Sequence, residues 1–123
     1  MRRTGFFVQF LFYSCHWWKR KKKVINSNLY ECYKEYFIAY KGIRDDRYSI
    51  FNFQYQYLVG NTYESHADFT SEENSFGLSV WTEEKAIEYC NQLVIKVKIR
   101  YEDIARLVHD NGKIRVTKFE VLT

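Results

Sequence analysis

Five consecutive cations, Lys19-Arg20-Lys21-Lys22-Lys23, form the densest group of chemically active side chains in the sequence, and they directly follow Trp17-Trp18. Clustered cations attract anions, and aromatic rings beside them suit the headgroup region of a membrane surface. The same cations could hold nucleic acid or act as a nuclear address. A third interpretation is a leader with no part in the working protein. All three interpretations remain open at this point.

The residues before this cluster are apolar and aromatic from Gly5 to Tyr13. A helix needs about 20 apolar residues to cross a bilayer, so this run is too short to span one. A cleavable signal would be followed by small residues, whereas this run is followed by tryptophans and cations. We therefore expect residues 1–28 to be a basic, aromatic segment outside the core, and residues 29–123 to form one domain.

Cysteine and histidine spacing argues against a metal centre. The three cysteines are odd in number and widely separated, and no paired CxxC or HxxxH spacing occurs, so we predict no metal site and free thiols in a reducing compartment. No serine stands in a GxSxG elbow, and there is no glycine-rich phosphate loop. The residues concerned are Cys15, Cys32, Cys90, His16, His66 and His109.

Charge is divided unevenly along the chain. Residues 1–35 carry eight Lys or Arg against two Glu, a net charge of +6. Residues 36–123 carry eleven Lys or Arg against thirteen Asp or Glu, a net charge of −2. The basic character belongs to the N-terminal segment, so the overall charge is no argument that the domain itself binds nucleic acid.

The first half of the domain shows both helical and strand patterns. Apolar spacing over residues 29–36 predicts a short helix, and residues 37–42 read as a first strand. Residues 50–58 alternate, which predicts a strand with one aromatic face. That face is more easily explained as core than as a platform for stacked bases. A short strand at residues 62–64 follows the Gly60-Asn61 turn, and residues 65–75 form a polar loop.

The second half has clearer boundaries. A strand is expected over residues 76–81, followed by a helix to about Asn91 with Thr82 as its N-cap. That helix should bury Ala86, Ile87 and Cys90. We further expect a strand at 94–99, a helical turn at 102–107, a tight turn at Asp110-Asn111-Gly112 and a last strand over 113–122. The order predicts an α+β fold with a small, mainly antiparallel sheet and one or two short helices.

One face of the strand at residues 94–99 is basic. Lys96, Lys98 and Arg100 alternate with apolar residues and should share the solvent side. With Lys113 or Arg115 from a neighbouring strand they could make a basic patch. The plainer interpretation is a solvated sheet face that discourages edge pairing.

Three blocks of sequence resemble a small uncharacterised domain found in phage and giant-virus proteins. The resemblance covers about Ile38 to Val121 and implies a viral or phage-type accessory protein. The blocks are YKG at residues 40–42, FxYxYxVGxTYE at 53–64 and SFGLSxWTxExAxxY at 75–89.

A more distant resemblance is to small ADP-ribosyltransferases. It is carried by the YKG strand, the GLS strand with the helix that follows it, and the VIKVKI strand at residues 94–99. This likeness implies an NAD site in which Lys41 and Tyr40 bind the cofactor, while Ser79 and Glu120 act in catalysis. A lysine replaces the usual first-strand arginine or histidine, and it lacks the planar fork that grips phosphate.

The sequence is best interpreted as a non-enzymatic interaction module that acts in the host cytoplasm on an unknown protein partner. A transferase-like domain that binds NAD is the first alternative. The second is peripheral membrane association through residues 5–23, with Lys19–Lys23 contacting either a membrane surface or nucleic acid.

Overall fold

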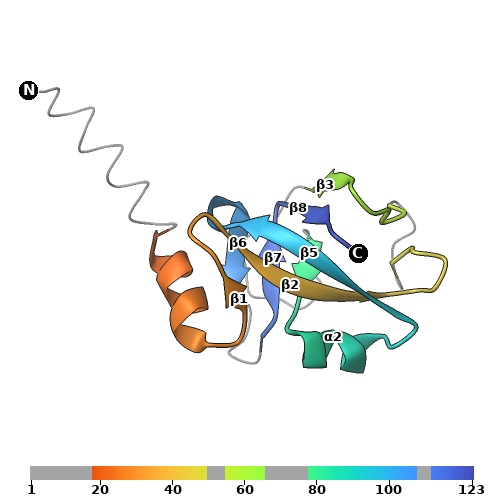
Figure 1. Cartoon of the computed structure of the whole chain (residues 1–123), viewed down its shortest axis with the longest axis horizontal. Coiled ribbons are helices and arrows are strands. Elements are labelled where there is room, and N and C mark those ends of the chain that lie inside the picture. The colour runs from red at the N-terminus through yellow and green to blue at the C-terminus, as the bar shows by residue number, and fades with distance from the viewer. Residues whose placement is uncertain (1–17, 50–54, 66–77, 108–111) are drawn as a thin grey trace, which may run out of the picture.

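The computed structural model describes residues 18–49, 55–65, 78–107 and 112–123, and it confirms the predicted α+β class (Figure 1). Within these residues, two helices accompany eight strands in two antiparallel sheets. The helices are the described part of the first helix, residues 18–27, and α2 (Glu83–Tyr89).

The larger sheet is built around the long pair β2 and β5, which run antiparallel over eight residue pairs. Apolar and cationic residues alternate over residues 95–100 of β5, which explains its position, because one face is buried and the other is charged. The structure contains strands at the three predicted places, 37–42, 62–64 and 94–99. In spatial order this sheet contains β1 (Glu31–Cys32), β2 (Tyr36–Ile43), β5 (Leu93–Arg100), β8 (Lys118–Val121) and β3 (Thr62–Glu64).

The smaller sheet continues from the edge of β2. Tyr40 and Trp81 exchange two backbone hydrogen bonds of 2.8 Å, so the strand ending before Trp81 joins β2 beyond the point where β1 stops. A 3₁₀ turn, η1 (Tyr101–Asp103), connects β5 of the larger sheet to β6 of the smaller one. In spatial order the smaller sheet contains β4 (Leu78–Val80), β7 (Ile114–Val116) and β6 (Ile104–Leu107).

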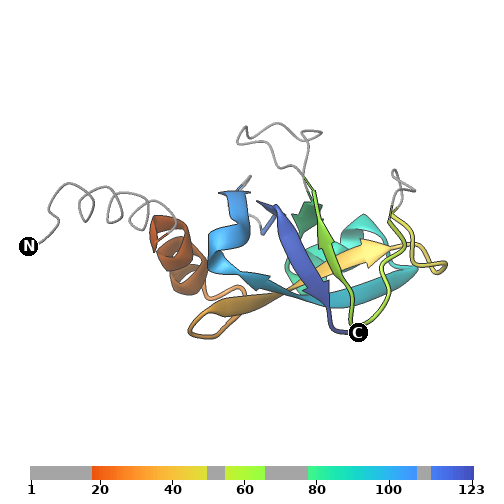
Figure 2. The same ribbon diagram turned by 90° about the horizontal axis from the view of Figure 1, so that it is seen from above.

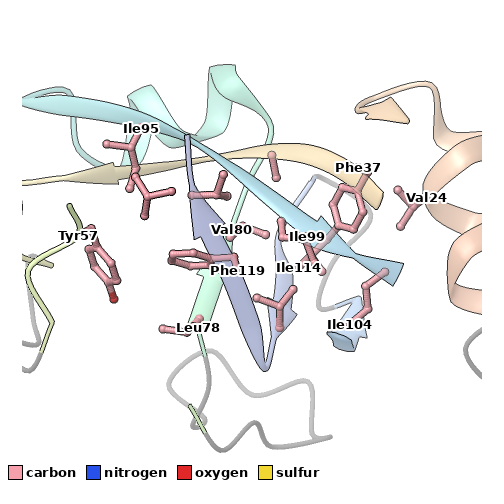
Figure 3. Packing of buried hydrophobic residues seen from close by; sticks show 14 of the residues in the cluster. Val24, Phe37, Tyr57, Leu78, Val80, Ile95, Ile99, Ile104, Ile114 and Phe119 are labelled. Atoms are coloured by element: carbon pink, nitrogen blue, oxygen red, sulfur yellow. The ribbon is translucent and has the colours of Figure 1, made fainter. Parts of the chain in front are cut away.

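The core lies between the inner faces of the two sheets, which bend around it (Figures 2 and 3). Aliphatic residues of β2, β4, β5, β6, β7 and β8 supply most of it, and Phe37, Tyr57 and Phe119 fill the space between them. Packing aromatic rings against β-branched residues is how a small domain buries enough apolar surface.

Helix α2 packs so closely against the outer face of the larger sheet that β2 has room only for a glycine at the point of contact. Gly42 faces Val94 across the β2–β5 pair, and a Cβ at Gly42 would overlap the carbonyl oxygens of Ala86 and Cys90. Thr82 caps the helix by accepting a hydrogen bond from the Lys85 amide at 3.3 Å, as predicted.

The helix at residues 18–27 packs against the end of the core. Val24 is buried and belongs to the core cluster, where Figure 3 shows it pointing toward Phe37. Residues 1–28 had been expected to lie outside the core, but the described part of this segment contacts the domain. Residues 1–17 lie outside the described part of the chain.

Two sequence-based expectations for the first half of the domain are corrected. Residues 29–36 are not a helix: Asn28 adopts a left-handed conformation that ends the first helix, and Tyr33 then donates to the Tyr36 carbonyl to close the β1–β2 turn. Residues 55–58 form no strand beyond a bridge between Tyr48 and Gln56, although Tyr57 is buried as expected. Residues 50–54, with Phe51 and Phe53, lie outside the described residues.

Three further expectations are corrected in the second half. The last strand is two strands of different sheets, because the Thr117 amide bonds to the Asp103 carbonyl and the chain crosses between the sheets there. The helical turn at 102–107 is a single 3₁₀ turn followed by β6. Ile87 is 47% exposed, since a seven-residue helix buries only the stripe that carries Ala86 and Cys90.

Candidate anion-binding cleft

The first helix is fixed to the domain by one apolar and one cationic contact. Val24 is buried against the core. Lys21 donates to the Lys34 carbonyl at 2.8 Å, and its ammonium lies 5.0 Å from the centre of the Tyr101 ring. Because these contacts lie on one side of the helix, its other lysines are directed away from the core.

A cleft of about 400 Å³ lies between this helix and the β6–β7 pair. Lys22 and Lys23 line it from the helix, and Lys113 lines it from the start of β7. Among the described lining residues none is acidic. The rest of the lining is mainly apolar and consists of Val24, Asn26, Ser27, Leu29, Tyr30, Leu107, Gly112 and Ile114. We call this the basic cleft.

A side-chain hydrogen bond ties the two walls of the basic cleft together. The Tyr30 hydroxyl donates to the Gly112 carbonyl at 2.6 Å, although the two residues are 82 positions apart. Burial raises the pKa of Tyr30, so this hydroxyl keeps its proton at physiological pH. Gly112 has a φ of 103°, a conformation that favours glycine, and a Cβ there would contact Thr82.

Positive charge accumulates around the cleft. Burial and the nearby charge of Arg106 lower the pKa of Arg20, which places cations of the helix and of β6 close together. The Lys113 ammonium lies 5.1 Å from the centre of the Trp81 ring, so a cation–π interaction partly stabilises its charge. Cations gathered in this region favour the approach of anions.

Lys41 and Ser79, two of the residues implied by the transferase resemblance, do meet. Lys41 is buried on the inner face of β2 and donates to the Ser79 carbonyl at 2.8 Å. The contact is to the Ser79 backbone. Burial and then the charge of Lys113 lower the pKa of Lys41 to about 8.

Glu120 and Tyr40 lie on the other face of the same sheet. Residues paired across antiparallel strands share a face, and Glu120 is paired with Lys98 and Thr62 on the outer side. Tyr40 is likewise paired with Lys96. The structure therefore does not gather Lys41, Tyr40, Ser79 and Glu120 around one cleft.

The basic patch proposed from sequence is only partly formed. Lys96, Lys98 and Arg100 share the outer face of β5 as expected. Lys113 and Arg115, however, are buried in the region of the smaller sheet and do not extend that face. Of the described cysteines, Cys32 and Cys90 are free thiols, and no group of three or more His, Cys, Asp or Glu among these residues could hold a metal ion.

Sequence reasoning singled out one wall of the basic cleft and missed the other. The run from Lys19 to Lys23 was an evident anion-binding candidate, whereas Lys113 was considered only as an extension of the basic face of residues 94–99. Residues 108–111 lie outside the described part of the chain.

Comparisons with known proteins add no family assignment. Neither the scan of protein-family models nor the searches of curated proteins and of solved structures returned a match. In the described part of the chain, no helix is long and apolar enough to cross a membrane.

Proposed function

We propose that this chain is a non-enzymatic binding module that holds an anionic group of its partner in the basic cleft. One observation carries the proposal: three lysines from segments about 90 residues apart converge on one partly apolar cleft. Lysines gathered at one cleft make it electropositive, and an electropositive cleft attracts anionic partners.

The dimensions and lining of the basic cleft suit a small anionic group. Ligand sites commonly measure about 300–1,000 Å³ and combine apolar walls with a few placed polar groups. Lysine ammonium groups bind phosphate as point charges, and apolar walls strengthen that attraction by excluding water. Phosphate-bearing partners are therefore the favoured class.

The lining offers binding groups rather than a catalytic arrangement. Each of its two described hydroxyl groups donates to a backbone carbonyl, Ser27 to Val24 at 2.7 Å and Tyr30 to Gly112 at 2.6 Å. No described lining residue is a histidine, a carboxylate or a cysteine that could act as a base for either hydroxyl. A viral or phage-type accessory role in the host cytoplasm remains part of the proposal on the strength of the sequence resemblance.

The direct test is to titrate the full chain with inorganic pyrophosphate and to monitor the amide chemical shifts by two-dimensional NMR. We expect saturable shifts at Lys23, Gly112 and Ile114. Lys23→Gln should weaken binding by about fivefold, since one exposed charge contact contributes about 1 kcal/mol. Lys19→Gln is the matched control, because it removes the same charge from the same helix outside the cleft lining.

Comparing the two variants distinguishes binding in the basic cleft from general electrostatic attraction of pyrophosphate to the helix. Equal weakening by Lys23→Gln and Lys19→Gln would mean that pyrophosphate senses only the net charge of the helix. Absence of saturable shifts on both sides of the cleft would overturn the proposed function.

A further inference from the structure

Three exposed apolar side chains lie next to the cations of the first helix. Trp18 is 45% exposed, Ile25 is 39% exposed and Leu29 is 48% exposed. Trp18 and Ile25 are seven positions apart, two helical turns, and therefore project from the same side of the helix. Leu29 follows the left-handed Asn28 and lines the basic cleft. We call these three residues the apolar edge.

The apolar edge and the cations belong to one surface. Lys22 is four positions after Trp18 and three before Ile25, so it lies between them on the helix. Residues 18–30 carry five cations and no carboxylate. Val24 attaches a different side of the helix to the domain, and Lys21 lies over the Trp18 ring at 4.9 Å, while Trp18, Ile25 and Leu29 stay exposed.

This combination selects among anionic partners. A nucleic-acid backbone offers phosphates to the cations but nothing that would bury aliphatic side chains such as Ile25 and Leu29. The surface of an anionic bilayer offers both, because apolar side chains enter the acyl boundary while nearby cations meet the headgroups. Aromatic residues such as Trp18 favour the same depth.

We infer that the anionic partner is a membrane containing acidic phospholipids, with the apolar edge in the bilayer interface and a headgroup phosphate in the basic cleft. This inference rests on the proposed function, since it names the source of the anion. The domain then sits at the membrane surface without crossing it. Its sheets stay in water behind the helix.

The test is co-sedimentation of the full chain with vesicles of phosphatidylcholine containing phosphatidylserine, beside vesicles of phosphatidylcholine alone. We expect binding to the acidic vesicles only. The double variant Ile25→Ser, Leu29→Ser should bind about tenfold more weakly, because two half-exposed aliphatic side chains no longer leave water. The matched control is Leu58→Ser, Val59→Ser, which removes two exposed aliphatic side chains far from the first helix and should bind normally.

Four outcomes would overturn the inference, and each leads to a different conclusion. If pyrophosphate still shifts the cleft amides but acidic vesicles are not bound, the cleft takes a soluble phosphate and the proposed function stands. If a DNA duplex binds and competes with pyrophosphate while vesicles do not, the partner is nucleic acid. If vesicle binding is unchanged in the Ile25→Ser, Leu29→Ser variant, the membrane contact lies elsewhere. Failure of pyrophosphate and vesicles together would overturn the proposed function as well.

Discussion

The ammonium group of Lys41 donates a 2.8 Å hydrogen bond to the backbone carbonyl of Ser79 from inside the core. The contact joins the inner face of β2 to β4 and also places the Lys41 ammonium 5.8 Å from the centre of the Tyr57 ring. A buried ammonium with one described acceptor loses most of its hydration, so the neutral amine is favoured. This explains why the pKa of Lys41 falls to about 8.

Stability should therefore rise with pH between about 8 and 10.5 on account of Lys41. The pKa of Lys41 is about 8 in the folded protein and 10.5, the value of an exposed lysine, in the unfolded chain. The unfolded chain therefore binds more protons in this window. The cost of burying the ammonium is fully present below pH 8 and is relieved as pH rises. Between pH 7 and 9.5 we expect the wild-type protein to gain about 2 kcal/mol of unfolding free energy relative to Lys41→Met.

Urea denaturation at both pH values measures this difference. The window stops at pH 9.5 because burial raises the pKa of Tyr30, Tyr57 and Tyr101, and the stability these groups give is lost at higher pH. Lys96→Met, on the outer face of β5, is the control that should follow the wild-type protein. Parallel pH profiles for wild type and Lys41→Met would show that Lys41 is solvated.

Gly42→Ala should destabilise the domain by about 3 kcal/mol. The added methyl group would overlap the backbone oxygens of Ala86 and Cys90, and a backbone cannot move aside as a flexible side chain can. Gly60→Ala is the comparison: its Cβ would meet open space, and only its φ of 87° is unfavourable, so about 1 kcal/mol should be lost. Thermal unfolding of the two variants measures these losses of stability. Equal losses would contradict the close approach of α2 to β2.

The elements that could be predicted from sequence were those with local signals. Alternation in residues 94–99 predicted both the strand and its buried face, and Thr82 with two following glutamates predicted the start of α2. These patterns depend only on neighbouring residues, and local chemistry is what a sequence displays directly.

The elements that sequence reasoning missed depend on distant contacts. The apolar spacing of residues 29–36 suited a helix, but the chain forms β1 there because it pairs with β2. Thr117 gives no local sign that the last strand divides, since its partner Asp103 lies 14 residues earlier. The separation of Lys41 and Glu120 follows from strand register, which periodicity alone does not supply.

Val24→Ala should release the first helix from the domain. Truncation of this buried side chain leaves a cavity beside Phe37 and should cost about 2 kcal/mol. Because the helix has few other core contacts, its amides should exchange with solvent well before those of β5. Ile25→Ala removes a larger but half-exposed side chain from the next position and should change stability little. Hydrogen exchange of the two variants tests this, and equal protection would contradict the docking by Val24.

NAD provides the test of the transferase alternative. That alternative requires one bound molecule to contact both a first-strand residue and the late glutamate, yet Lys41 faces the core while Glu120 faces outward beside Lys98. We therefore expect ligand-observed NMR to show no saturable binding at millimolar NAD. If NAD does bind, Lys41→Ala should leave any contact at Glu120 intact, because the sheet separates the two side chains. If NAD binds saturably and both Lys41→Ala and Glu120→Gln abolish that binding while remaining folded, this placement is contradicted. That result would support the transferase interpretation.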